Sequence, residues 1–267
     1  MNNIRIILAR CFQGQNKRGV EHGGQQLLER LHFPFNVSRV DPFLFDNISK
    51  GTKCVYDYTR KTFHARTTPI IIGGDHSISA GSVQAAVDWH GSDLHVVWVD
   101  AHADINTPAT SNTGHVHGMP VASLLGLMNP LVPRKVKLLP QQITYIGLRD
   151  VDQAEEVFLK KHSISVYRMT DINKKGIETI TKEIKQKVQG KKIHMSVDID
   201  ALDPAYAPST GTPVHGGMKV TEVTHLIKEL SNKLCSLDLV EVNPSIGSKK
   251  GVDTTLDSAA EILNNAT

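Results

Sequence analysis

A short run of aspartate and histidine residues has the spacing of a metal-binding motif. The run Asp100-Ala101-His102-Ala103-Asp104 follows directly after the apolar segment 94–99. Extended backbone places alternate side chains on one side, so Asp100, His102 and Asp104 would project together. Metal ligation explains this spacing, and a solvated strand end carrying helix or turn caps explains it about equally well for this motif alone.

A second group of polar residues is Gly73-Gly74-Asp75-His76-Ser77, where an expected strand ends and a helix begins. Its glycines allow a tight turn, and Asp75 or Ser77 could cap the following helix. The group could also hold a phosphate at a helix N-terminus, although it matches neither the Rossmann glycine pattern nor the P-loop. Taken alone, the group favours a turn with a cap.

The third group runs from Ser196 to Pro204 and contains Asp198 and Asp200 on one face of another strand end. Carboxylates that face other carboxylates across a crevice repel one another and are forced towards raised pKa values. Two divalent cations remove this conflict, because their four positive charges balance the negative charges of the four aspartates Asp100, Asp104, Asp198 and Asp200 in the first and third groups. The neutral imidazoles of His76 and His102 would complete the coordination shells.

The candidate ligands offer only oxygen and imidazole nitrogen, which favours a hard or borderline metal such as manganese over a closed structural zinc site. They are His76, Asp100, His102, Asp104, Asp198 and Asp200. Two metal ions about 3.5–4 Å apart can share and deprotonate a bridging water, so hydroxide forms near neutral pH without a basic side chain. The pattern therefore predicts hydrolysis at two Mn(II) ions per chain.

In this order, the three groups resemble those of the arginase family, the ureohydrolases with two manganese ions. The resemblance covers most of the chain and extends to Gly19-Val20-Glu21, Asp104-Ile105-Asn106-Thr107-Pro108, His117-Gly118-Met119-Pro120, Gly147-Leu148-Arg149-Asp150-Val151-Asp152, Gly211-Thr212-Pro213 and Glu241-Val242-Asn243-Pro244. It implies that all the candidate ligands bind the metal pair, several aspartates as bridges. It also implies that Asp104 accepts a hydrogen bond from the bridging hydroxide, which attacks a guanidinium carbon and releases urea and an amine.

The resemblance also assigns residues to the leaving amine and to the guanidinium. His117 matches the family's proton-shuttle histidine, and the alternative is a structural histidine near the pocket mouth. Glu241 matches the carboxylate that grips the guanidinium, a planar fork suited to bidentate binding, with Thr212 supporting it. The alternatives are a strand-end surface residue for Glu241 and a turn residue for Thr212.

An amino-acid-reading region at the pocket mouth is the third implication of the resemblance. Asn106 and Thr113 match positions that contact an α-carboxylate, and Asp152 and Glu155 match positions that reach an α-ammonium, partly through water. These matches favour L-arginine, hydrolysed to L-ornithine and urea, over agmatine, which lacks the carboxylate. Thr113 stands where serine is usual and His115 where asparagine is usual, so affinity or selectivity could differ.

Other functions stay open at the level of sequence. The same metal pair could hydrolyse agmatine or another guanidino or formimino compound. A metal-bound scaffold without turnover would bind metal and arginine but release no urea. A phosphate-binding protein built on Gly73-Gly74 is the weakest alternative, because it leaves both aspartate groups unexplained.

The elements that must position these residues alternate along the chain. Short runs rich in valine and isoleucine predict strands at 4–8, 69–72, 94–99, 143–146, 163–167, 193–197 and 237–242. Amphipathic stretches predict helices near 20–31, 79–89, 121–127, 153–161, 176–188, 220–232 and 254–263. The alternation predicts an α/β fold, with a mostly parallel sheet and helices on both faces, in one domain over residues 1–267. Ligands bind beyond the carboxyl ends of such strands. Residues 41–66 are expected to be a loop with one short helix.

Composition bounds the partners and the compartment. The chain has 267 residues, 40% hydrophobic and 21% charged, with a formal net charge of +3, which is typical of an ordered soluble protein. Its lysine pairs are spread out and lack interleaved aromatic residues, which argues against nucleic acid. The first apolar run is too short for a signal peptide or a membrane span, so we expect a cytoplasmic protein without membrane partners.

Two further expectations concern thiols and assembly. Cys11, Cys54 and Cys235 are widely separated and are expected to be reduced. The chain ends at Thr267, soon after its last expected helix, and lacks the extended tail through which many arginase-family relatives join as trimers. The resemblance therefore implies a homo-oligomer only weakly.

Overall fold

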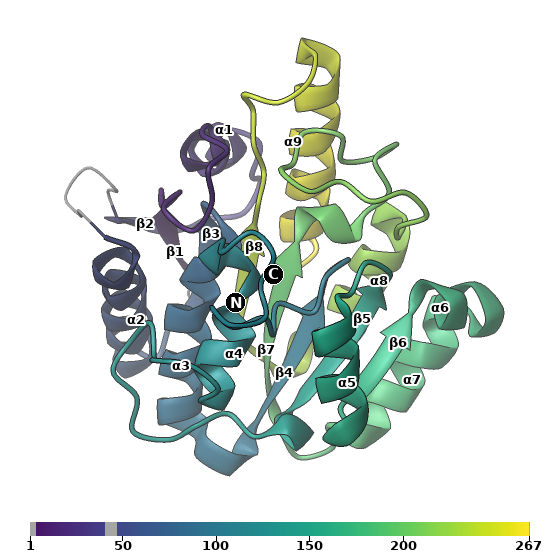
Figure 1. Cartoon of the computed structure of the whole chain (residues 1–267). Coiled ribbons are helices and arrows are strands. Elements are labelled where there is room, and N and C mark those ends of the chain that lie inside the picture. Colours follow the sequence, from purple (N-terminus) through teal and green to yellow (C-terminus); the bar gives the residue numbers. More distant parts are fainter. Residues whose placement is uncertain (1–3, 41–46, 267) are drawn as a thin grey trace.

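Parallel strands form one continuous sheet through the middle of the molecule (Figure 1). The computed structural model describes residues 4–40 and 47–266. Within them the sheet has the order β2-β1-β3-β8-β7-β4-β5-β6, and all neighbours are parallel. The strands are β1 Ile4–Ala9, β2 Asn36–Val40, β3 Thr68–Gly73, β4 Leu94–Val99, β5 Ile143–Leu148, β6 Ser165–Arg168, β7 Lys192–Asp198 and β8 Leu234–Val240. The predicted α/β fold with a parallel sheet is confirmed.

Helices cover both faces of this sheet, also as predicted (Figure 1). They are α1 Gly23–Leu28, α2 Ile48–His64, α3 Ser79–His90, α4 Pro120–Leu125, α5 Gln153–Lys161, α6 Met169–Lys175, α7 Ile177–Lys187, α8 Val220–Leu230 and α9 Lys249–Asn264. Apolar residues of α1, α7, α8 and α9 cluster with Val97 and Leu239 on one face. Those of α2, α3, α4 and α5 cluster with Val96 and Trp98 on the other. All side chains of β4 are buried as a result.

The expectation of a loop with one short helix over residues 41–66 is wrong for its described part. Residues 48–64 form a single helix, α2, of 17 residues. The buried face of α2 carries threonines among its apolar residues, so its apolar pattern is weak. Thr52 and Thr59 are buried, and each donates its hydroxyl to the backbone carbonyl four residues earlier. That bond satisfies a buried hydroxyl within the helix. Residues 41–46 lie outside the described residues.

Smaller differences concern elements with weak patterns. β2 and α6 were not expected: β2 is an edge strand paired with β1, and the buried residues of α6 are only Met169 and Ile172. The helix expected near 20–31 is a 3-10 turn, Val20–His22, followed by the short α1. α9 begins before the expected position, because the Ser248 side chain accepts a hydrogen bond from Gly251 N and caps the helix.

The strand order brings the polar groups of the sequence to one edge of the sheet. β3, β8, β7 and β4 are consecutive neighbours. The groups containing His76, Asp198 and Asp100 follow β3, β7 and β4, and Glu241 follows β8 between them. Since the carboxyl ends of parallel strands meet at one edge, these residues converge although they are far apart in the sequence.

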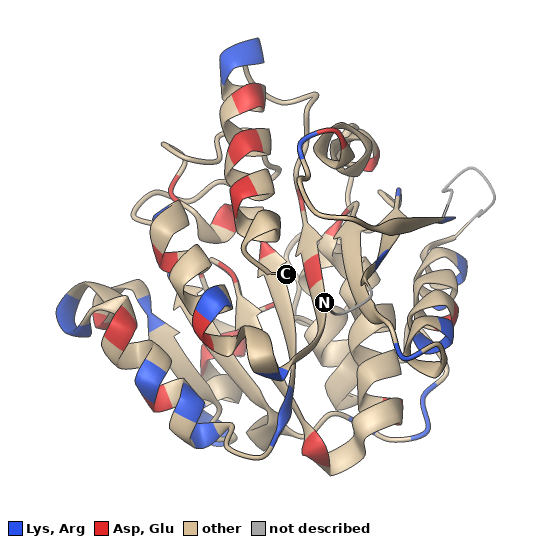
Figure 2. Cartoon of the chain, turned by 180° about the vertical axis from the view of Figure 1, so that it is seen from behind, with Lys and Arg blue, Asp and Glu red and all other residues tan. Residues whose placement is uncertain are grey.

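The lengths of the helices, the cysteines and the distribution of surface charge are three further features of the fold. No helix within residues 4–40 and 47–266 is long and apolar enough to cross a membrane. None of the three cysteines is joined to another by a disulfide bond. Figure 2 shows lysine and arginine on several separate helices, interspersed with acidic residues. On α7, Lys185 lies 2.8 Å from Glu229 of α8.

Candidate metal centre and pocket

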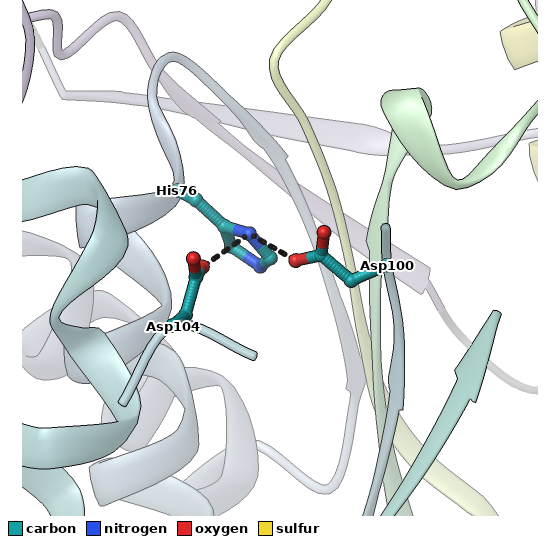
Figure 3. Close-up of side chains that lie close together, drawn as sticks. All are labelled: His76, Asp100 and Asp104. Carbon is teal, nitrogen blue, oxygen red and sulfur yellow. Dashed lines mark ion pairs between the residues drawn. The ribbon is translucent and has the colours of Figure 1, made fainter. Parts of the chain in front are cut away.

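His76 lies within a ring of carboxylates. Its Nδ1 is 3.2 Å from Asp100 Oδ2, 3.1 Å from Asp104 Oδ2 and 3.0 Å from Asp198 Oδ2. Figure 3 shows the imidazole between Asp100 and Asp104. The His76 side chain is 1% exposed, yet Nδ1 makes no hydrogen bond of normal geometry. A buried nitrogen that faces several carboxylate oxygens without bonding to them is suited to sharing a cation with them.

Two neighbours fix the orientation of the His76 ring. The ring stacks on the Trp98 indole, with centroids 4.3 Å apart and planes 13° apart. Its Nε2 lies 2.9 Å from Ser196 Oγ. With the Nε2 proton donated to Ser196, Nδ1 carries the lone pair that faces the carboxylates. Just before this residue the chain passes close to the backbone of Cys11. Only glycine fits there, because a Cβ on Gly74 would lie 1.9 Å from the Cys11 carbonyl oxygen.

His102 lies beside a second set of carboxylates. Its Nδ1 is 3.4 Å from Asp100 Oδ1 and 3.2 Å from Asp200 Oδ2. Its Nε2 is 3.6 Å from Asp150 Oδ2, an outer carboxylate to which the sequence analysis gave no role. Asp100 therefore turns one oxygen towards each histidine. This placement suits a carboxylate that bridges two metal ions.

The charges of the cluster fit cations. Two groups have ligand atoms within 4.8 Å of one another: His76, Asp100 and Asp104, and Asp100, His102 and Asp200. Burial and the charge of Asp100 raise the pKa of Asp104 to about 6. Burial and the neighbouring aspartates also raise the pKa of Asp198 well above its usual range. Asp104 Oδ2 is buried without a hydrogen-bond partner. Bound cations would relieve both the repulsion and the missing contact.

Two of the expected site residues have strained backbone. Asp104 has φ 54° and Glu241 has φ 67°, in the left-handed region that favours glycine. Such a conformation costs about 1–3 kcal/mol and persists where the surrounding structure imposes it, often at functional sites. Glu241 follows directly on the central strand β8, and Asp104 lies in the loop after the central strand β4.

Glu241 lies under the cluster and is 1% exposed, so the alternative of a surface residue is wrong. Its Oε1 accepts a hydrogen bond from His76 N at 2.9 Å and lies 3.1 Å from His117 Nδ1. Its Oε2 accepts one from Gln15 Nε2 at 2.6 Å. Although burial opposes ionisation, His117 and these bonds lower the pKa of Glu241. No sequence pattern links Gln15 to Glu241, so its contact was missed.

His117 contacts Glu241 directly, whereas the hydroxyl of Thr212 contacts Asp200. Thr212 Oγ1 donates to Asp200 Oδ2 at 2.8 Å, so its hydroxyl supports a candidate metal ligand, and no hydrogen bond joins it to Glu241. His117 is held in place by its backbone N–H, which donates to Gly14 O at 3.0 Å. Burial disfavours the imidazolium of His117, but Glu241 and Asp104 outweigh burial and raise its pKa to about 9.

A pocket of about 140 Å³ extends from His117 and Thr212 to the expected amino-acid-reading region, and Glu241 is not among its lining residues. It is lined by His76, His102, Asp104, Asn106, His117, Gly118, Asp150, Asp152, Glu155, Asp198 and Thr212. A larger cavity of about 420 Å³ is lined mainly by apolar side chains, including Phe33, Ile70 and Leu237, and no titratable side chain is among its described lining residues. The clustered histidines and carboxylates therefore line the smaller pocket and not the larger apolar cavity.

At the pocket mouth, the expected substrate-binding residues contact one another. Asn106 Nδ2 donates to Asp152 Oδ2 at 2.8 Å. Glu155 accepts hydrogen bonds from Ile105 N at 2.9 Å and from Asp152 N at 3.0 Å, which ties the loop after β4 to the start of α5. Burial raises the pKa of Glu155 to about 7. Thr113 is exposed outside the pocket lining, with its hydroxyl accepting from His115 N at 3.2 Å.

Comparisons with known proteins agree on one family. The sequence profile of the Arginase family matches residues 3–267. The chain is 37% identical to "Arginase, non-hepatic 2" of Xenopus laevis, over 98% of this chain and 82% of that protein. The crystal structure of arginase from Bacillus subtilis superposes with a TM-score of 0.90 at 30% identity, covering 99% of this chain and 98% of that one.

A protein that is named for a different activity has a similar fold. The structure of formimidoylglutamase from Bacillus subtilis covers 99% of this chain and 85% of its own, with a TM-score of 0.84 and 23% identity. At that identity the likeness shows the fold alone. The fold is thus shared by hydrolases that act on different compounds, and the pocket itself must decide between substrates.

Proposed function

Because the chain belongs to the arginase family of metal-dependent hydrolases, we propose that it hydrolyses L-arginine to L-ornithine and urea at two Mn(II) ions. The observation that carries the proposal is the single pocket lined both by candidate metal ligands and by Asn106, Asp152 and Glu155. Metal chemistry alone would suit many hydrolases. The polar mouth adds groups that can bind the two ends of an amino acid.

The proposed metal ligands are the residues of the cluster: His76, Asp100, His102, Asp104, Asp198 and Asp200. Bound there, the metal pair would supply a hydroxide at neutral pH. The chain's own residues hold that nucleophile: the Asp104 carboxylate, which lines the pocket, would accept its hydrogen bond and aim it at the guanidinium carbon. The oxygen-rich ligand set without thiolate favours manganese over zinc.

The proposed acid is His117. Its Nδ1 is engaged by Glu241, so its Nε2 is the nitrogen that can exchange a proton. With a pKa of about 9, the imidazole carries that proton at neutral pH. It would give the proton to the amine nitrogen as the carbon–nitrogen bond breaks, because an alkylamine leaves poorly without one.

Glu241 would bind the guanidinium of the substrate. Although burial opposes ionisation, His117 and the hydrogen bonds from His76 N and Gln15 lower its pKa, which favours the charged carboxylate. Its oxygens already accept hydrogen bonds from His76 N and from Gln15, which hold the carboxylate in one orientation. A fixed carboxylate loses little entropy when a planar guanidinium donates to it.

Recognition of arginine rather than agmatine would depend on the α-carboxylate. Asn106 uses one N–H for Asp152, and a primary amide has a second to donate. Asp152 and Glu155 would hold the α-ammonium, which agmatine also provides as its amine. Thr113 could contact the carboxylate only at the outer edge of the mouth, since it lies outside the pocket lining.

A direct test compares L-arginine, agmatine and N-formimino-L-glutamate in parallel, with manganese-loaded protein and a chelated control. We expect urea and ornithine from arginine, only with manganese, and much slower release from agmatine. A preference for agmatine would retain the metal chemistry and overturn the proposed reading of the mouth. Arginine binding without urea from any substrate would indicate a scaffold instead.

A further inference from the structure

The rings of His115 and His117 lie side by side, and His117 lines the pocket. Their ring centroids are 5.7 Å apart and their planes are tilted by 52°. We propose that His115 carries protons between solvent and His117, so that the two imidazoles form a relay. The inference rests on the proposed function, in which His117 protonates the leaving amine.

A relay is useful because His117 is enclosed. Its side chain is 16% exposed, and its Nδ1 is occupied by Glu241 at 3.1 Å. The charged groups facing it are Glu241 after β8, Asp104 after β4 and Asp75 after β3. All three favour the imidazolium. Once His117 has given its proton to the amine, these groups make the neutral ring a strong acceptor that needs a nearby donor.

The backbone holds His115 in the right place for this. Val116–Gly118 form the 3-10 turn η5, in which Gly118 N donates to His115 O at 3.3 Å. His115 N donates to Thr113 Oγ1 at 3.2 Å, and Thr113 is exposed. His115 itself is half-buried, and its ring lies beside that of His117. Imidazole is the side chain best suited to exchanging protons near neutral pH.

Protons balance over a turnover. When water in the pocket is converted to hydroxide, one proton leaves to solvent. One proton returns from solvent through His115 to Nε2 of His117, and from there to the amine nitrogen as its bond to carbon breaks. No oxidant, reductant or further reactant is needed.

The test is His115→Asn, which removes the imidazole but keeps a hydrogen-bonding side chain. The matched control is His225→Asn, a half-buried histidine in α8 away from the pocket. Urea release from L-arginine is measured in dilute buffer, with and without added imidazole. In parallel, proton exchange between water and the His117 ring is measured by nitrogen-15 NMR on protein loaded with diamagnetic magnesium, with His117→Asn to assign the signal.

We expect His115→Asn to lower kcat about tenfold, part of the factor typical of acid–base catalysis, with KM changed less than twofold. Added imidazole should restore much of the rate, and ring exchange at His117 should slow by a similar factor. An unchanged exchange rate would overturn the relay. So would a raised KM with normal kcat, because His115 would then act on substrate binding.

A failure of the proposed function can be distinguished from a failure of the relay. If unaltered protein releases no urea from arginine, the function is wrong and the exchange measurement alone decides the relay. Slower exchange in His115→Asn, with His225→Asn unchanged, would then still support proton transfer between the two rings. Equal exchange in all the proteins that retain His117 would overturn it.

Discussion

At the scale of single residues, Asp104 combines more unusual features than its neighbours. It has a positive φ of 54°, and its Oδ2 is buried without a hydrogen-bond partner 3.1 Å from His76 Nδ1. It also lines the pocket that we assign to the substrate. A strained, unsatisfied carboxylate is costly for stability, and its retention is explained by binding a cation and holding the nucleophile.

Asp104→Asn keeps the size of the side chain and removes its charge. We expect kcat for urea release to fall about 100-fold or more, because the neutral amide binds the metal pair more weakly and is a poorer hydrogen-bond acceptor for the hydroxide than the carboxylate. Rates are measured together with metal content. Asp257→Asn, on the exposed side of α9, is the control. Near-normal turnover by Asp104→Asn would contradict the proposed mechanism.

Asp152 belongs to substrate binding rather than to the reacting atoms. Asp152→Ala should raise KM for L-arginine about tenfold, an effect of about 1.4 kcal/mol, while kcat changes little. Asp152→Asn tests whether charge or shape matters, since it keeps a polar contact for Asn106. Steady-state kinetics with saturating manganese provide both constants. An unchanged KM in both variants would exclude Asp152 from binding the α-ammonium.

At the scale of elements, β4 shows how a strand positions the site and also limits stability. All its side chains are buried, including His95, whose Nε2 lies 2.9 Å from Thr144 Oγ1 of β5. Burial, helped by Lys187 and Lys191, lowers the pKa of His95 to about 4. The unfolded chain binds a proton there below about pH 6.5, whereas the folded chain does so only near pH 4.

The lowered pKa of His95 makes the stability of the folded chain depend on pH. The stabilising effect of neutral His95 is complete above about pH 6.5 and is lost as pH falls from there to about 4. Between pH 6 and 4.5, the metal-free protein should lose about 1 kcal/mol per pH unit more than His95→Gln does. Urea unfolding of both proteins at several pH values measures this. Parallel stability curves would show that His95 is not buried in its neutral form.

Elements buried on both faces were the ones that the sequence predicted well. β3 and β4 are short apolar runs rich in isoleucine or valine, as expected of strands that helices cover on both sides. α2 was expected only as one short helix in a loop, since its buried threonines satisfy their hydroxyls within the helix and dilute the apolar pattern. The edge strand β2 has one neighbour and a mixed sequence, so it produced no clear signal.

The candidate site was predictable only in part, for a related reason. The spacing of Asp100 and Asp104 was noticed on the expectation of extended backbone, which is wrong, because β4 ends at Val99 and Asp104 has φ 54°. Resemblance to a family was needed for His117 and Glu241. Gln15 and Asp150 were missed, because their contacts join segments far apart in the sequence. Thr212 was expected to support Glu241, but the fold of its loop turns its hydroxyl to Asp200.

At the scale of the whole molecule, like charges are concentrated at one edge of the sheet in a chain of net charge +3. Without cations, the raised pKa values of Asp104 and Asp198 mean that rising pH ionises them against repulsion. This repulsion destabilises the folded chain as pH rises through the raised values, about 6 for Asp104. Bound metal removes the repulsion and stabilises the folded state.

Chelation should therefore lower the unfolding midpoint in urea, and by more at pH 8 than at pH 5.5. Protons neutralise part of the cluster at the lower pH, and they also compete with metal there. The comparison uses manganese-loaded and chelated protein at each pH. A difference between the two forms that shrinks as pH rises would oppose this explanation of the buried charges.

The central claim is that the cluster binds two manganese ions close enough to share one oxygen. The most direct measurement is electron paramagnetic resonance during manganese titration, with metal content and urea release determined on the same samples. We predict two ions per chain, the spectrum of a magnetically coupled pair about 3.5–4 Å apart, and activity that rises with that signal. Saturation at one ion per chain, or two uncoupled ions in a fully active protein, would contradict the account.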